Sequence, residues 1–65
     1  MNTIDLVALE ELVDRWTLGG LLNGLATICA EKAEHVRSNW QDDEMADQWS
    51  RDGGRIARTA YRVEG

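Results

Sequence analysis

The pattern that most constrains the fold is a row of apolar and small residues near the C-terminus. Alternate steps of three and four residues separate its six members, which are Ala46, Trp49, Gly53, Ile56, Ala60 and Val63. This spacing repeats along one face of an α-helix, whereas the side chains of a β-strand alternate every two residues. The row therefore predicts a helix over about residues 41–62, with a seam for a partner helix.

A pair of glycines, Gly53 and Gly54, lies in the middle of this predicted helix. Each glycine costs about 1 kcal/mol in a helix interior relative to alanine, and Asp-Gly-Gly is also typical of a turn. Because the seam keeps its phase across the pair, we expect the helix to continue. Gly53 and Ala60 would then let a partner helix approach closely. A break at Gly53-Gly54 is the alternative interpretation.

A first helix is predicted over about residues 3–17, with Thr3 as its N-cap. Helical spacing unites the members of its apolar stripe, which are Leu6, Leu9, Val13 and Trp16. We expect the helix to end at Leu18-Gly19-Gly20, because glycine readily takes the left-handed conformation at a helix C-terminus.

A second helix is predicted over about residues 21–37. Its apolar stripe consists of Leu22, Leu25, Cys29, Ala33 and Val36. A turn is expected near residues 38–40, where Ser38 or Asn39 would cap the third helix and acidic residues would fill its first turn. The sequence contains no proline and no strand-like alternation. It therefore predicts an all-α fold, a helical hairpin with an additional N-terminal helix.

The chain has 65 residues, which predicts a single small domain over residues 1–65. A domain of this size buries only about 60% of its unfolded surface and needs support beyond its own core. The single cysteine, Cys29, excludes an intramolecular disulfide, and one histidine with one cysteine is too few for a structural zinc site. We therefore expect a homo-oligomeric bundle without metal or cofactor, with Trp16, Trp49 and Ile56 at the subunit contact.

The net charge of −5 argues against generic nucleic-acid binding and against binding to anionic membranes. No apolar run approaches the roughly 20 residues that span a bilayer. Residues 1–10 also lack the basic start of a signal peptide. The expected location is the cytoplasm.

Four arginines near the C-terminus are spaced by four, three and four residues: Arg51, Arg55, Arg58 and Arg62. On a helix they fall within an arc of roughly 60°, nearly opposite the seam. Guanidinium groups in a row suit phosphates, which they bind through paired hydrogen bonds. Two structural interpretations remain open. In the first, the arginines stabilise the C-terminal end of the helix through its dipole, and Arg51 pairs with Asp47. In the second, they contact an acidic helix of another protomer.

His35 and Asn39 are one helical turn apart, as are Glu31 and His35. Such pairs serve metal binding or acid–base chemistry in some proteins, but a hydrogen-bonded histidine beside the apolar stripe is the simpler interpretation. Trp40 would either cap the bundle or stand in a groove. With the four arginines, His35, Asn39 and Trp40 complete a candidate anion-binding site. Cys29 is expected to be a small buried hydrophobe, and no catalytic constellation is present, so we expect no enzyme activity.

The segment EKAEHVRSNWQD, residues 31–42, resembles a segment of short, uncharacterised helical proteins of phages and prophages. This resemblance implies a mobile-element origin and a non-catalytic role in binding, inside the host cell. Two modes follow from it: sequestration of an anionic nucleotide signal used in host defence, or capping of a host protein surface.

We therefore predict a non-catalytic binding protein that interferes with a host process by sequestering a nucleotide-like anion. An inhibitor or adaptor that binds a host protein directly is the first alternative. A purely structural helical assembly protein is the second.

Overall fold

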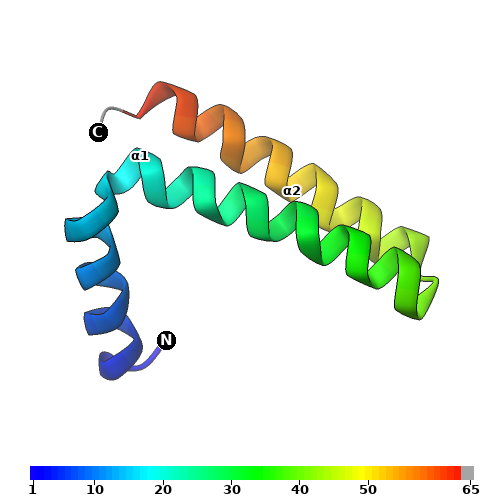
Figure 1. Cartoon of the computed structure of the whole chain (residues 1–65), viewed down its shortest axis with the longest axis horizontal. Helices are drawn as coiled ribbons and strands as arrows, with labels where there is room; N and C mark the ends of the chain where they lie inside the picture. The colour runs from blue at the N-terminus through cyan, green and yellow to red at the C-terminus, as the bar shows by residue number, and fades with distance from the viewer. Residues whose placement is uncertain (64–65) are drawn as a thin grey trace.

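Within residues 1–63 the fold is all-α and consists of two helices joined by a π-helical turn (Figure 1). Helix α1 spans Thr3–His35, the turn η1 spans Val36–Trp40, and helix α2 spans Asp43–Arg62. The computed structural model describes residues 1–63. The second half of α1 runs antiparallel to α2, which forms the predicted helical hairpin, and the first half turns away from it (Figure 1).

The bend in α1 lies at Thr17, whose backbone has φ 67° and ψ 161°. Glycine is almost the only residue that adopts this region without strain. The Thr17 hydroxyl accepts a hydrogen bond from the backbone N–H of Gly20 at 3.1 Å, so Thr17 is the N-cap of the segment that follows. The predicted glycine ending is therefore wrong: Gly19 and Gly20 are helical, and a capping threonine makes the break.

The other helix starts also differ from the prediction by a residue or more. Asn2, not Thr3, caps α1 by accepting the N–H of Asp5 at 2.8 Å. Asp42 caps α2 by accepting the N–H of Met45 at 3.0 Å, so α2 starts after residue 42. Both capping residues are of the types that bind exposed N–H groups best.

The predicted caps Ser38 and Asn39 lie inside η1 instead. The Ser38 hydroxyl donates to the Glu34 carboxylate at 3.5 Å, and Asn39 bonds back to His35. Each is therefore engaged one turn earlier in the chain, which leaves the capping of α2 to Asp42. Gln41 completes the reversal in the left-handed conformation, with φ 54°.

The predicted seam of α2 faces α1, and the helix continues through both glycines. Ala46, Gly53 and Ala60 are buried, and the other three members of the seam are half-buried: Trp49, Ile56 and Val63. A Cβ atom at Gly53 would lie 2.8 Å from the Cβ of Cys29 and 3.4 Å from the carbonyl oxygen of Ala26. The close approach of the two helices therefore requires glycine at position 53, as the seam predicted.

The core between the helices is built from small side chains. Cys29, Ala33 and Val36 of the predicted second stripe are buried. Leu22 is half-buried, whereas Leu25 is 38% exposed and lies outside the core. Trp49 packs over the buried cluster of Ala33, Val36 and Ala46. No large side chain among residues 1–63 is fully buried, so the hairpin core is thin.

Within residues 1–63, Arg37 makes the ion pairs that cross the hairpin, on its polar side. The guanidinium of Arg37 lies 3.0 Å from the carboxylate of Asp47 and 3.8 Å from that of Asp43. The predicted Asp47–Arg51 pair is not formed, because Arg37 in η1 faces the first turns of α2 and engages Asp47 instead.

Candidate functional site

The four arginines form one exposed surface on the outer side of α2, which we call the arginine face: Arg51, Arg55, Arg58 and Arg62. Two shallow hollows of 340 Å³ each lie on it. Arg55 and Arg58 line both hollows, so the face is continuous along the last three turns of the helix. A face of this kind is open to solvent and to large ligands.

Three of these guanidinium groups have no acidic partner within residues 1–63. Among the described residues, only Asp52 lies near one of these arginines, with its carboxylate 4.0 Å from the guanidinium of Arg55. An exposed pair at this distance contributes little to stability and does not occupy the guanidinium donors. The arginine face therefore presents its hydrogen-bond donors to solvent, although the chain as a whole carries a net charge of −5.

Besides Ser50, two residues that were not among the predicted site residues line the arginine face, Gly54 and Thr59. A Cβ atom at Gly54 would meet nothing within 4 Å, so the backbone there is open to close approach by a ligand. The Thr59 hydroxyl donates to the carbonyl oxygen of Arg55 at 3.0 Å. Both residues lie three or four positions from two of the arginines, so helical spacing places them on the same face.

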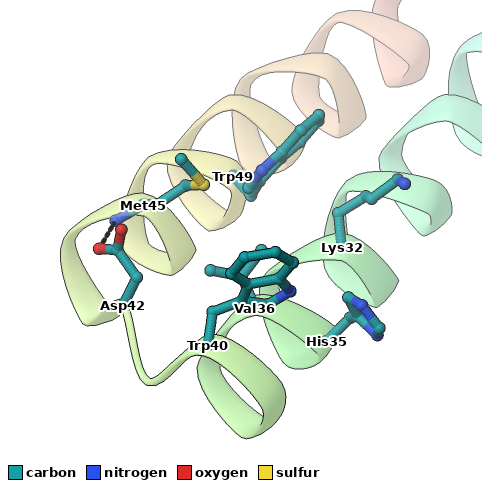
Figure 2. Close-up of a pocket in the computed structure, with 7 residues that line it drawn as sticks. All are labelled: Lys32, His35, Val36, Trp40, Asp42, Met45 and Trp49. Atoms are coloured by element: carbon teal, nitrogen blue, oxygen red, sulfur yellow. Dashed lines mark hydrogen bonds between the residues drawn. The ribbon is translucent and has the colours of Figure 1, made fainter.

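A second surface, which we call the tip groove, lies near the turn of the hairpin (Figure 2). It has a volume of 440 Å³ and is lined by Lys32, His35, Val36, Trp40, Asp42, Met45 and Trp49. Met45 and Trp49 stand on one side and Lys32 and His35 on the other, with Trp40 between them (Figure 2). Trp40 is 72% exposed, so it stands in a groove and does not close the end of the core.

The polar groups of the tip groove are partly engaged. The Nδ2 atom of Asn39 donates to the carbonyl oxygen of His35 at 3.1 Å and lies 3.1 Å from the Nδ1 atom of its ring. The Asp42 carboxylate caps α2 (Figure 2). The Lys32 ammonium makes no ion pair with any residue in the described range, so it supplies an available cation at the rim.

His35 also shares a hollow of 310 Å³ with Ile28, Glu31 and Lys32. Glu31 and His35 are thus near each other, as the sequence predicted. Within residues 1–63, no group of three or more histidine, cysteine, aspartate or glutamate side chains is arranged to hold a metal ion.

The predicted anion-binding residues fall on two surfaces. His35 and Trp40 line the tip groove, with Asn39 bonded to His35, whereas the arginines lie on the outer side of α2. The hollows of the arginine face share no lining residue with the groove. Sequence reasoning did not include Lys32 or Met45, although each lies three or four residues from a predicted member.

The residues predicted at a subunit contact are differently exposed. Trp16 is 59% exposed, while Trp49 and Ile56 are half-buried against α1. Each of the three therefore presents some apolar surface.

No family model matches the chain, and neither a curated protein nor a solved structure is significantly similar to it. None of the helices within residues 1–63 is long and apolar enough to cross a membrane.

Proposed function

We propose that the protein is a non-catalytic binding protein whose arginine face binds a phosphate-bearing, nucleotide-like anion. One observation carries this proposal. Arg51, Arg58 and Arg62 lie on one helix face and pair with no acid among residues 1–63, in a chain where acids outnumber bases by 12 to 7. In the phage-type context that the sequence suggests, sequestering such an anion would remove it from a host process.

The chemistry of the arginine face favours phosphate over other anions. Each guanidinium offers a planar fork of N–H donors that matches two phosphate oxygens, and such charge-assisted bonds are roughly twice as strong as neutral ones. The open backbone at Gly54 gives a ligand room between Arg51, Arg55 and Arg58. A ligand with two or more phosphates would engage several arginines together.

Calorimetric titration with pyrophosphate and with a nucleoside triphosphate tests the proposal. Arg55→Glu and Arg58→Glu should each abolish binding, and Arg58→Lys should weaken it, because lysine lacks the fork. Arg15→Glu is the matched control, since it makes the same charge change at an exposed arginine on the N-terminal half of α1. We expect this control to keep full affinity.

The stability of the variants must be measured in parallel. Exposed substitutions change the free energy of unfolding by less than about 0.5 kcal/mol, so a loss of binding in folded Arg55→Glu protein would be a loss of contact. Unchanged affinity in both charge reversals would remove the arginine face from the site. An equal loss of affinity in Arg15→Glu would show that the loss in the other variants comes from the change in net charge alone.

The tip groove supports a second candidate function, direct binding of a host protein as an inhibitor or adaptor. Trp40 is exposed beside Met45 and Trp49, and tryptophan is among the residues that dominate protein interfaces. Trp40→Ala should then abolish binding of that partner, whereas Tyr61→Ala, at a side chain that is 93% exposed on α2, should not. Equal binding by both variants would exclude the groove from such a contact.

A further inference from the structure

The chain exposes more surface than a compact protein of its mass. Its accessible surface is 5322 Å², whereas a folded monomer of 7.3 kDa exposes about 4,200 Å² by the usual scaling with mass. The excess is about 1,100 Å², and a stable interface of standard size buries about 800 Å² on each partner. The excess surface of one copy is therefore sufficient for one such interface.

Exposed apolar side chains occur along the whole chain, and in two places they form a row or a cluster. The first is the N-terminal stripe, the predicted row on the first half of α1: Leu6, Leu9, Val13 and Trp16. Leu6 is 54% and Trp16 59% exposed, and Leu9 and Val13 are only half-buried. The first half of α1 turns away from the hairpin (Figure 1), so this stripe lacks a helix packed along it within the chain.

The second place is the hairpin face, formed by Ile28, Trp40, Met45 and Trp49. Three hollows with shared lining residues connect them. Lys32 and His35 line both the hollow at Ile28 and the tip groove, and Met45 and Trp49 line both the tip groove and a third hollow on α2. Ile28, Met45 and Trp40 are 48%, 49% and 72% exposed. The hairpin face is thus continuous across both helices.

We propose that the N-terminal stripe of one copy packs on the hairpin face of a second copy, and reciprocally, to form a two-fold symmetric dimer. The two surfaces match in length. Leu6 and Trp16 are ten residues apart, about 15 Å along a helix, and Ile28 and Trp40 are twelve residues apart, about 18 Å. Reciprocal packing covers both surfaces of both copies, as a closed two-fold interface requires.

Pairing of the two N-terminal stripes with each other is less favourable. The straight part before Thr17 has only about four turns, and helices of this length are marginal in water without extensive tertiary packing. That arrangement would also leave Ile28, Trp40 and Met45 exposed. The reciprocal arrangement accounts for both apolar surfaces with one contact.

Light scattering at about 100 µM, a concentration well above the dissociation constant of a standard-sized interface, provides the first test. We expect twice the chain mass of 7.3 kDa, and a rise in the thermal midpoint as the unmodified protein is concentrated, because association stabilises the folded state by mass action. A mass of 7.3 kDa with a concentration-independent midpoint would overturn the proposal and leave the hairpin face to a host protein.

Charged variants test the pairing itself. Leu6→Glu/Trp16→Glu disrupts the stripe, and Ile28→Lys/Met45→Lys disrupts the hairpin face, so each should lose the dimer mass. Mixing the two variants should restore it, since one contact is then intact and the other joins glutamate to lysine. Ile4→Glu is the control for the stripe, because Ile4 is 79% exposed and lies on the opposite side of the helix.

The mixing result remains decisive even if a variant fails to fold alone, because circular dichroism of the mixture would then report recovered helix. A hairpin-face variant that keeps the dimer mass would overturn reciprocal packing in favour of stripe-to-stripe pairing. Failure of the mixture to recover either mass or helix would also overturn it. Neither outcome affects anion binding at the arginine face, which is measured by titration with pyrophosphate.

Discussion

Gly53 is the residue on which the hairpin contact depends most directly. Its missing side chain lets α2 approach α1 until the position of a Cβ would be 2.8 Å from the Cβ of Cys29. This neighbour is fixed to the backbone and cannot move aside as the end of a long side chain would. The preference of helices for alanine over glycine is therefore opposed here by packing.

Alanine substitutions at the two adjacent glycines should have opposite effects. Gly53→Ala should lower the free energy of unfolding by about 1 kcal/mol, because overpacking outweighs the gain in helix propensity. Gly54→Ala should raise it by roughly 0.5–1 kcal/mol, since a Cβ there meets nothing within 4 Å. Urea denaturation of both variants measures the difference. A stabilised Gly53→Ala would show that the helices can separate without cost.

The residue scale also shows what the sequence could and could not predict. The burial of Ala46, Gly53 and Ala60 followed from spacing alone, because a helix presents every third or fourth residue to the same side. The cap at Asp42 and the bend at Thr17 did not follow, since several neighbouring residues could cap and only backbone geometry selects among them. Likewise, spacing placed the four arginines on one face but could not separate them from Trp40.

The bend between the two halves of α1 is the main feature at the scale of elements. Thr17 holds it in a conformation that costs about 1–3 kcal/mol for a residue other than glycine, and its hydroxyl offsets part of this cost by capping Gly20 at 3.1 Å. The strain and the cap therefore act in opposite directions at the same residue.

Thr17→Gly should raise the free energy of unfolding by about 1 kcal/mol. Relief of the strain exceeds the cost of glycine in the unfolded chain, about 0.5–1 kcal/mol, and the loss of the cap costs only a few tenths. Thr17→Ser keeps both the hydroxyl and the Cβ, so it should change stability by less than about 0.5 kcal/mol. Thermal denaturation followed by circular dichroism measures both variants. Destabilisation by glycine would mean that the cap contributes more than the strain costs.

The ion pair of Arg37 with Asp47 joins η1 to α2 on the polar side of the hairpin but should add little stability. Their side chains are 45% and 64% exposed, and exposed pairs contribute about 0.2–1 kcal/mol. A double-mutant cycle with Arg37→Ala and Asp47→Ala in urea should therefore give a coupling energy below about 1 kcal/mol. A larger coupling would indicate that this side is shielded from solvent in the assembled protein.

The whole molecule combines an exposed cationic face with exposed apolar surfaces, and salt should separate their contributions. Raising sodium chloride from about 0.05 to 0.5 M shortens the screening length to a few ångströms and should weaken pyrophosphate binding several-fold. Association through the N-terminal stripe and the hairpin face should persist, because burial of apolar surface does not depend on charge. Titration and light scattering across the salt series measure the two effects. Dissociation with increasing salt would instead indicate contacts between arginines and acids of another copy.

At this scale, composition and spacing predicted the helical hairpin and its N-terminal helix. The direction of the N-terminal helix was not predictable, since it depends on two dihedral angles at Thr17. The thinness of the core followed in part, because the seam of α2 alternates alanine and glycine with larger residues. The bend determines which apolar surfaces stay exposed, so these surfaces could not be predicted from the sequence.

The bend also makes the shape of the molecule depend on the backbone conformation of one residue. A straight helix of the 33 residues of α1 would be about 50 Å long, whereas the largest dimension of the bent chain is 37 Å. Rotation of φ and ψ at Thr17 alone would straighten α1 and change the position of its N-terminal half relative to the hairpin. A substitution that moved residue 17 to helical dihedral angles would thus change the shape of the molecule without altering a residue of either apolar surface.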